Sequence, residues 1–274
     1  MALNHTHNAR LLRQETAAGA GVQLLLLTLL GASLDLGPAG WLTGLVFAAV
    51  TWAVLTRAVS RSWLSSFGPA NRVTLARATL VGGVTALVAD SFTHPPRVAV
   101  LTALTAVALI LDAVDGQVAR RTGTSSALGA RFDMEVDAVL ILVLSVYVAT
   151  ALGPWVLLIG AMRYAFVAAA RFLPWLSAPL PHSMARKTVA ALQGVALLVA
   201  ATGLLPAPAN LAVVLLALTS LVWSFARDIG WLWSTARADA RTAPERPVAR
   251  VAHLARPVPR VVTADDGALP ARSA

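Results

Sequence analysis

Apolar residues gather along the chain in eight long stretches, with short polar or Gly/Pro-rich segments between them. A helix needs about 20 apolar residues to cross a bilayer, and each stretch is close to that length. Helix-breaking pairs such as Gly37-Pro38, Pro95-Pro96 and Gly153-Pro154 fall in the gaps. The pattern therefore predicts eight transmembrane helices, over residues 18–35, 40–58, 72–90, 97–114, 134–152, 154–174, 187–204 and 208–226.

A short amphipathic piece, SRSWLSSFGPAN, separates the second and third stretches. Its polar residues alternate with Trp63 and Phe67, which are side chains that favour the headgroup region of a membrane. We expect this piece to lie along the membrane interface.

The composition agrees with a membrane protein. The chain has 274 residues, of which 57% are hydrophobic and 13% charged, and a mean hydropathy of +0.71. Soluble domains carry about 25% charged residues, so this chain could not cover itself with polar surface in water. It has no cysteine, which excludes disulfides, thiolate metal sites and a cysteine nucleophile. The N-terminal residues lack the layout of a cleaved signal peptide, so the first stretch is expected to remain as a spanning helix.

The net charge of +9 comes almost entirely from arginine. Cytoplasmic loops of membrane proteins carry an excess of Lys and Arg. With the N-terminus in the cytoplasm, the loops on the other side keep only Arg97. The residues then placed inside are Arg10, Arg13, Arg57, Arg61, Arg72, Arg120, Arg121, Arg131, Arg171, Arg186, Lys187 and the tail from Arg227. Both termini are therefore expected to be cytoplasmic.

The C-terminal tail, residues 237–274, is rich in Arg, Pro and Ala without apolar periodicity and is expected to be disordered. Two interpretations stay open for it: a solvated tail, or a segment that contacts anionic lipids through its arginines.

The scarce negative charge concentrates in one window. Five of the 13 acidic residues, Asp112, Asp115, Asp133, Glu135 and Asp137, lie between Leu111 and Leu140. Positions three or four apart share a helix face, so two aspartates before the turn RTGTSS and two after it can converge. Glu135 lies two positions from both Asp133 and Asp137 and so points away from their stripe.

Four convergent carboxylates near lipid need positive partners, which could be arginine or divalent cations. Hard oxygen ligands suit Mg²⁺ or Mn²⁺, and without a histidine in the window we do not expect zinc. A pair of metal ions about 3.5–4 Å apart could clamp a diphosphate. Taken singly, the small residues could serve helix packing, an aspartate could cap a helix, and the arginines could be membrane anchors. Together, ionisable residues at membrane depth indicate a functional site.

The order Asp112-x-x-Asp115-Gly116-x-x-Ala119-Arg120, eight residues, then Gly129-x-x-x-Asp133-x-x-x-Asp137 resembles the signature of the CDP-alcohol phosphatidyltransferase family. All eight defining positions match. Upstream, GPANRVTLARATL resembles the family's P-N-x-x-T-x-x-R segment, with Ala70 where proline is usual. The resemblance implies an all-α integral membrane fold. Its six-helix catalytic domain would cover residues 71–236, preceded by a cytoplasmic segment at 1–17 and two additional helices with the interfacial piece at 18–70.

The resemblance also implies roles for these residues. Asp112, Asp115, Asp133 and Asp137 would hold two divalent ions, and Asp137 would also be the general base for the acceptor hydroxyl. The CDP moiety would be bound by Asn71, Thr74, Arg77, Gly116, Ala119, Arg120 and Gly129. The reaction implied is transfer of a phosphatidyl group from CDP-diacylglycerol to an alcohol, with release of CMP. A homodimer is implied in the same way, and no nucleic-acid partner is expected.

The acceptor alcohol is expected to contact a second, basic set of residues. Arg163 lies mid-span, where an arginine is costly and should face a polar cavity or a carboxylate. Further basic and polar positions follow at Arg171, His182, Ser183, Arg186 and Lys187. This cluster suits a phosphate on the acceptor. It faintly resembles the G-K-x-K-T stretch of phosphatidylglycerophosphate synthases but departs from it at several positions. Glycerol-3-phosphate and inositol phosphate are thus both candidates, and Arg186 and Lys187 could also be simple membrane anchors.

Three alternatives to this function differ in what they predict. The donor could be a CDP-linked small alcohol with diacylglycerol as acceptor. A transporter would show repeated polar helices in both halves, whereas the acidic cluster occurs once. A noncatalytic lipid-binding relative would lack at least one of the aspartates.

Overall fold

The computed structural model describes residues 2–61, 69–122, 127–181 and 183–242. Within these ranges, side chains are not described for residues 2–16, 58–61, 69–71, 115–122, 127–128, 239–240 and 242. The described residues form helices and connecting turns, with no strand among them. The fold is therefore all-α, as the hydropathy pattern predicts.

Eight α-helices and two short 3₁₀ helices make up the described chain. They are α1 (Ala2–Leu34), α2 (Pro38–Arg61), α3 (Pro69–Asp90), α4 (Val98–Thr122), α5 (Ala127–Leu152), η1 (Pro154–Val156), α6 (Leu157–Phe172), η2 (Pro174–Ser177), α7 (Met184–Ala201) and α8 (Ala207–Thr242). Seven of them are long and apolar enough to cross a membrane, and the described side chains of α4 form a shorter apolar stretch, Val98–Val114. The protein is an integral, multi-pass membrane protein.

The helix ends differ from the ends of the predicted spans where a helix continues into polar residues or stops before its apolar stretch does. Helix α5 begins at Ala127, before the predicted 134. Its first turns carry charged residues of the window, so they were not part of the apolar stretch from which the span was predicted. Helix α8 continues to Thr242, beyond the predicted 226, and only its last turns, residues 236–241, are dominated by Ala and Arg, which have good helix propensity. Pro174 ends α6 at Phe172. Trp63 and Phe67 of the expected interfacial piece lie outside the described residues. The tail was expected to be disordered from residue 237, but residues 237–242 belong to α8, and the residues from 243 on lie outside the described part of the chain.

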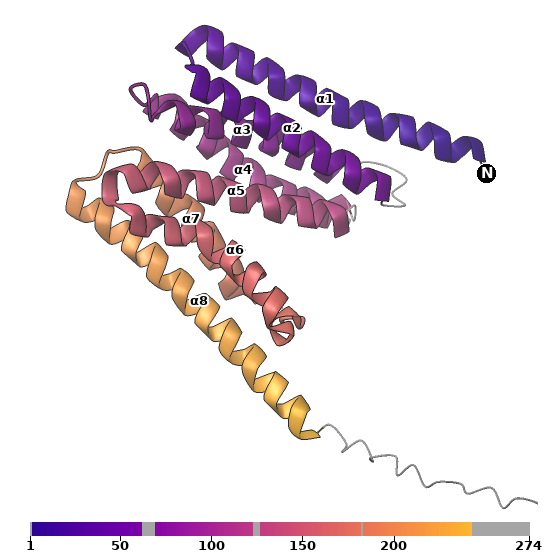
Figure 1. Ribbon diagram of the computed structural model, residues 1–274, viewed down its shortest axis with the longest axis vertical. Helices are drawn as coiled ribbons and strands as arrows, with labels where there is room; N and C mark the ends of the chain where they lie inside the picture. Colours follow the sequence, from indigo (N-terminus) through magenta and orange to yellow (C-terminus); the bar gives the residue numbers. More distant parts are fainter. Residues whose placement is uncertain (1, 62–68, 123–126, 182, 243–274) are drawn as a thin grey trace, which may run out of the picture.

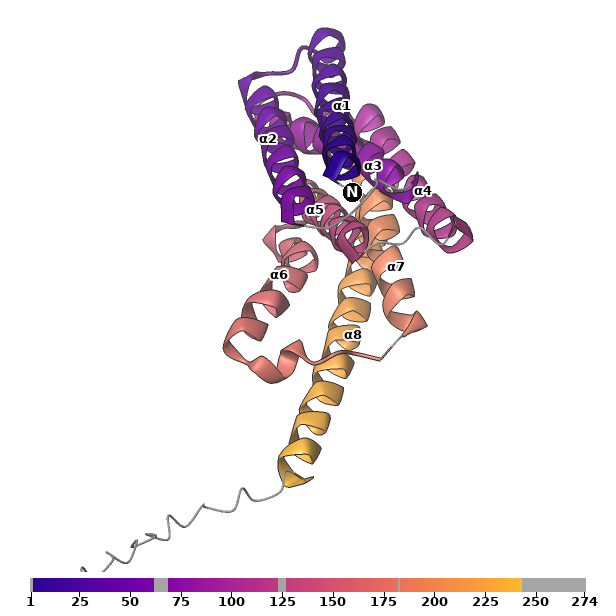
Figure 2. The same cartoon turned by 90° about the vertical axis from the view of Figure 1, so that its right-hand side faces the viewer.

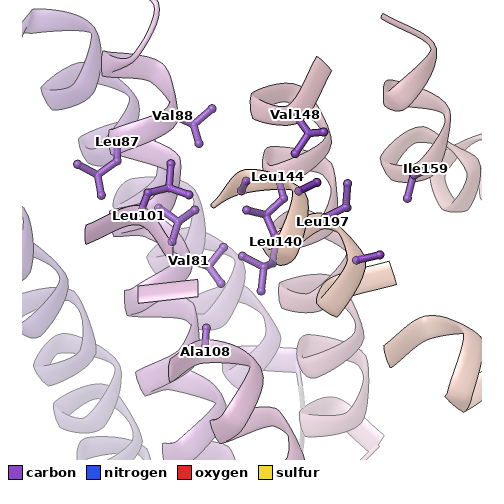
Figure 3. Packing of buried hydrophobic residues seen from close by; sticks show 14 of the residues in the cluster. Val81, Leu87, Val88, Leu101, Ala108, Leu140, Leu144, Val148, Ile159 and Leu197 are labelled. Carbon is purple, nitrogen blue, oxygen red and sulfur yellow. The ribbon is translucent and has the colours of Figure 1, made fainter. Parts of the chain in front are cut away.

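Helix α3 lies at the centre of the bundle. It packs against α1, α2, α4 and α5 (Figures 1 and 2), and 67% of its apolar segment is buried, against 22% for α1 and for α2. Helix α5 continues the packing to α6 and α7, and α8 lies along α7. Figure 3 shows this apolar core, to which α3, α4, α5, α6 and α7 contribute Val81, Leu87, Val88, Leu101, Ala108, Leu140, Leu144, Val148, Ile159 and Leu197.

The two N-terminal helices are packed tightly onto α3 through glycines. A β-carbon at Gly82 of α3 would lie 2.1 Å from the side-chain nitrogen of Gln23 in α1. A β-carbon at Gly44 of α2 would lie 2.6 Å from Leu27 of α1 and 3.3 Å from the β-carbon of Ala86 in α3. Small residues at such crossings allow membrane helices to approach closely and gain dispersion contacts. Helices α1 and α2 are thus an integral layer of the bundle.

A hydrogen-bonded turn fastens the same two helices to the end of α3. The backbone N–H of Gly37, between α1 and α2, donates to Oδ1 of the buried Asp90 at 2.8 Å. The same oxygen lies 3.0 Å from Nδ1 of His94. Arg97 donates to the carbonyl of Leu34 at 3.1 Å. These bonds lie at the end of the bundle opposite the acidic window.

Candidate functional site

The acidic window folds into a cluster of three carboxylates around one arginine. Arg77 projects from α3 and is only 1% exposed. Its Nη1 lies 2.9 Å from Oδ1 of Asp112 on α4, and its guanidinium donates to Asp133 and to Asp137 on α5. The three aspartate side chains are 32–40% exposed. A buried cation thus joins three helices, and the carboxylates around it remain accessible to a ligand. We call these four residues the aspartate cluster.

Local helix geometry explains why these side chains meet. Asp133 and Asp137 are four residues apart on α5 and so lie one above the other on the same face. Asp112 lies near the C-terminal end of the apolar part of α4, Val98–Val114, and α4 packs against α3. Thr74, three residues before Arg77 on α3, is 4% exposed, and Gly129 begins the cluster's stripe on α5. The first turns of α3 and α5 and the end of α4 therefore form one site at one end of the bundle, which we call the aspartate end.

The donor set fits a divalent cation. One carboxylate oxygen from each of Asp112, Asp133 and Asp137 lies within 4.8 Å of the other two. Oxygens that bind Mg²⁺ octahedrally at about 2.0–2.1 Å are separated by about 3–4 Å, so a small contraction would bring these atoms to ligand distance. Within the aspartate cluster, three negative charges face the single positive charge of Arg77. Hard oxygens, an excess of negative charge and access to solvent are what Mg²⁺ or Mn²⁺ requires.

Several predicted residues have side chains outside the described part of the chain. Asn71 lies in the first turn of α3, and Asp115, Gly116, Ala119 and Arg120 lie in the last turns of α4, with only their backbone described. His182 lies outside the described residues altogether. The roles of these six residues therefore remain predictions.

Arg163 of α6 has a carboxylate partner that the sequence pattern did not single out. Its Nη2 donates to Oε1 of Glu135 at 2.6 Å. Glu135 points from α5 toward α6, away from the stripe of Asp133 and Asp137, as the helix periodicity predicts. A mid-span arginine is satisfied in this way by an acidic residue on the neighbouring helix. The signal that could have identified the pair is that both residues are charged within adjacent apolar stretches.

The start of α7 is held against α8 by a second set of polar contacts. Nε of Arg186 lies 3.0 Å from Oδ2 of Asp228, and its Nη2 donates to the carbonyl of Pro181 at 2.8 Å. Arg227 donates to Oγ of Ser183 at 3.0 Å. Arg227 and Asp228 were missed as candidate residues, although Asp228 is an isolated acid at the end of the last apolar stretch. Arg171 and Lys187, also predicted for the acceptor, are exposed at the end of α6 and the start of α7.

Comparison with known protein families decides what kind of protein carries this site. The model of one family, described as CDP-alcohol phosphatidyltransferase, matches residues 67–225, more than half of the chain. The chain belongs to the CDP-alcohol phosphatidyltransferase family. The matched region includes all of α3 to α7 and the membrane-spanning part of α8, and hence the whole aspartate cluster. No curated protein and no solved structure matches the chain significantly.

Family membership and the membrane-spanning helices place the chain among enzymes of phosphatidyl transfer. Members are typically dependent on divalent metal, in agreement with the carboxylate geometry. Helices α1 and α2 lie outside the matched region, yet they pack on the family's first helix, α3.

Proposed function

We propose that this member of the CDP-alcohol phosphatidyltransferase family transfers a phosphatidyl group from CDP-diacylglycerol to an alcohol and releases CMP. The observation that carries the proposal is the aspartate cluster, in which carboxylates from two helices converge on Arg77 within the matched region. Phosphoryl transfer depends mainly on positioning and on neutralising charge on the phosphate oxygens. A site of convergent carboxylates at the end of membrane helices can do both for a lipid-linked diphosphate.

In this proposal each residue of the cluster has a defined task. Asp112, Asp133 and Asp137, together with Asp115, would hold Mg²⁺ or Mn²⁺, which supplies positive charge to the diphosphate oxygens when bound. Asp137 takes the proton of the acceptor hydroxyl. The acceptor oxygen then forms a bond to the phosphorus of the phosphatidyl group as the bond from that phosphorus to the CMP oxygen breaks. Asn71, Thr74, Gly116, Ala119, Arg120 and Gly129 would surround the CDP moiety.

Arg77 has a second task besides the one that the sequence resemblance implies. Its guanidinium fork is engaged by three carboxylates, so it orients their oxygens before substrate binds. Because it is almost fully buried, it reaches the nucleotide only if one of these carboxylates turns toward a metal ion. We therefore propose that Arg77 organises the carboxylates and contacts the diphosphate only when they are engaged elsewhere.

We propose that the aspartate end faces the cytoplasm. The turns at the opposite end, residues 35–37, 91–97, 153 and 202–206, contain Arg97 as their only Lys or Arg. The aspartate end carries Arg57, Arg72, Arg171, Lys187 and Arg227, among others. The positive-inside rule then favours cytoplasmic termini and a cytoplasmic catalytic site.

The acceptor is proposed to enter between the aspartate cluster and the basic residues of α6 and α7. Arg163 and Arg186 are each held by one carboxylate, so their positions are fixed while their remaining N–H groups can bind an anion. Arg171, Ser183, Lys187 and His182 would complete this wall. Such a lining supports a phosphorylated acceptor, for which glycerol-3-phosphate and inositol phosphate are the candidates.

The proposal is tested by measuring CMP release from CDP-diacylglycerol by the purified full-length protein. The assay contains Mg²⁺ or Mn²⁺ and, one at a time, glycerol-3-phosphate, inositol phosphate, inositol, serine or phosphatidylglycerol. We expect release with a phosphorylated alcohol and loss of release in EDTA. No release with any acceptor would refute the proposal, and turnover of a CDP-linked small alcohol with diacylglycerol would reverse the donor assignment.

A matched pair of variants tests the base. Asp137→Asn removes the carboxylate that accepts the proton, so we expect turnover to fall by at least about 100-fold with donor binding largely kept. Glu135→Gln changes a carboxylate two residues away on the same helix and outside the aspartate cluster. Because it releases Arg163, it should raise the KM for the acceptor but keep the turnover at saturating acceptor. Equal loss of turnover and donor binding in Asp137→Asn would remove the base assignment. Asp112→Asn should instead shift the metal titration.

A further inference from the structure

Helix α8 is longer than a membrane span requires. Its 36 residues correspond to about 54 Å at about 1.5 Å per residue, whereas the hydrocarbon core is about 30 Å thick. Starting from Ala207, the core is crossed after about 20 residues, close to Arg227. The remaining residues would then leave the bilayer at the aspartate end, where the lower part of α8 extends beyond the other helices in Figures 1 and 2. This segment therefore runs through the headgroup layer and beyond it.

In the C-terminal half of α8, one face packs against the rest of the protein. Leu221 is 9% exposed, Ser224 3% and Leu232 1%. Phe225 and Asp228 lie on the same side, since these positions are three or four residues apart. Their neighbours are α7, α6 and η2, which pack against α8. This face is thus already occupied within the chain.

The opposite face carries tryptophan and arginine. Trp223, Arg227, Ser234, Arg237 and Arg241 follow one another at steps of four, seven, three and four residues, and all are exposed. Trp231 and Trp233 flank this stripe and are 40% and 48% exposed. We call Trp223, Arg227, Trp231, Trp233, Arg237 and Arg241 the Trp/Arg face.

Two of the arginines are stacked on tryptophans of their own face. The guanidinium of Arg227 lies 5.1 Å from the ring centre of Trp223, and that of Arg237 lies 3.5 Å from Trp233. Stacking fixes the plane of the guanidinium and leaves its N–H edge available for planar, bidentate hydrogen bonds. Arg227 also bonds to Ser183 and Asp228, so Arg237 and Arg241 are the better placed to bind an external anion.

We propose that the Trp/Arg face is a binding surface for the phosphate groups of anionic lipids in the adjoining leaflet. Tryptophan favours the boundary between hydrocarbon and headgroups. Trp223 and Trp231 lie four residues to either side of Arg227, where α8 reaches that boundary, and Trp233 follows two residues later. Arginine binds phosphate bidentately. The charge of the face is positive and complementary to an anionic leaflet, and its position continues directly from the membrane-embedded part of α8.

The chain offers a clean way to test this surface, because it has no cysteine. Ser234→Cys introduces a unique labelling site on the Trp/Arg face, and Leu204→Cys gives a control site at the opposite end, where Leu204 is 86% exposed. The labelled full-length protein is reconstituted in phosphatidylcholine nanodiscs that contain a trace of headgroup-labelled phosphatidylglycerol or phosphatidylcholine. Energy transfer from the protein label then reports which lipid gathers at each site.

We expect stronger transfer to phosphatidylglycerol than to phosphatidylcholine at position 234 and equal transfer at position 204. One arginine near an anionic surface changes the local lipid concentration by about fivefold, so Arg237→Gln should lower the enrichment by about that factor. Arg97→Gln removes one positive charge at the opposite end of the bundle and should leave the enrichment at position 234 unchanged. Arg237→Lys keeps the charge and should retain most of the enrichment. Salt at about 1 M should weaken the enrichment in the unmodified chain.

Three results would overturn the proposal. Equal transfer to the two lipids at position 234 would show that the face does not select anionic lipid. Loss of the enrichment with millimolar inorganic phosphate, but not with chloride of equal ionic strength, would assign the face to a free phosphate. Transfer between labels on two copies, independent of lipid composition, would make the face an interface between copies of the chain.

Discussion

Replacing Arg77 by methionine tests most directly how the charges of the aspartate cluster are balanced. The substitution keeps a long side chain but removes the positive charge that pairs with Asp112, Asp133 and Asp137 among the described side chains. The three carboxylates then repel one another without the guanidinium that joined them. A bound divalent ion could take over that role, so the cost of the substitution should depend on metal.

The structure gives the size of the effect. The carboxylate oxygens lie within 4.8 Å of one another. At that separation two like charges repel by about 0.9 kcal/mol in water and about 3.5 kcal/mol at an effective dielectric constant of about 20. The aspartates are 32–40% exposed, which favours the lower part of this range. Loss of one partner from a buried ion pair costs about 3–5 kcal/mol, so we take about 3 kcal/mol for this partly solvated cluster.

The assay is thermal unfolding of the detergent-solubilised protein, followed by size-exclusion fluorescence, in EDTA and in millimolar Mg²⁺ or Mn²⁺. About 3 kcal/mol corresponds to a Tm loss of about 6–12 °C for a chain of this size. We expect that loss for Arg77→Met in EDTA and recovery of at least half of it with metal. Arg163→Met is the matched control, because Arg163 pairs with the single, half-exposed Glu135 and should lose less than about 1 kcal/mol regardless of metal.

The reasoning fails if Arg77→Met loses the same stability in EDTA as in metal, or loses none. If Arg77→Met cannot be purified, Arg77→Lys keeps the charge but not the fork that reaches three carboxylates. That variant should then show a smaller loss with the same dependence on metal.

Three further outcomes are expected. Gly82→Leu should lower the unfolding free energy by about 1–3 kcal/mol, because a side chain there collides with α1, whereas Gly21→Leu, with nothing within 4 Å of its β-carbon, should be silent in the same thermal assay. Asp90→Ala should cost about 1–3 kcal/mol in that assay by leaving the N–H of the α1–α2 turn without its acceptor; an unchanged Tm would show that water replaces it. Asp228→Asn should raise the KM for the acceptor by about fivefold with the KM for the donor unchanged, because it releases Arg186; parallel changes in both would indicate a general loss of structure.

Much of the fold followed from hydropathy alone. Eight apolar stretches became eight helices, because a chain with this composition must bury its backbone polar groups in helices inside a bilayer. The ends of α1, α4, α5 and α8 were placed less well, since their terminal turns are helical but polar. Hydropathy reports where a helix meets lipid, and helix propensity and packing decide where it ends.

The acidic window could be predicted as a site from the sequence, because helix periodicity depends only on neighbouring residues. Spacings of three and four residues put Asp133 and Asp137 on one face before any neighbour was known, and the same periodicity turned Glu135 away. That the three aspartates close around Arg77 depends on how α3 packs between α4 and α5. The partnerships of Arg163 with Glu135 and of Arg186 with Asp228 depend in the same way on contacts between helices.

The sequence by itself determined the number of helices, the helix faces that carry charge and the resemblance to the family. Only the tertiary structure decided which charges meet. It made Arg77 the centre of the aspartate cluster, gave Arg163 and Arg186 carboxylate partners of their own, and packed α1 and α2 onto α3 through glycines. The physical reason is that hydropathy and periodicity act over a few neighbouring residues. An ion pair across helices requires two distant segments to share one position in space.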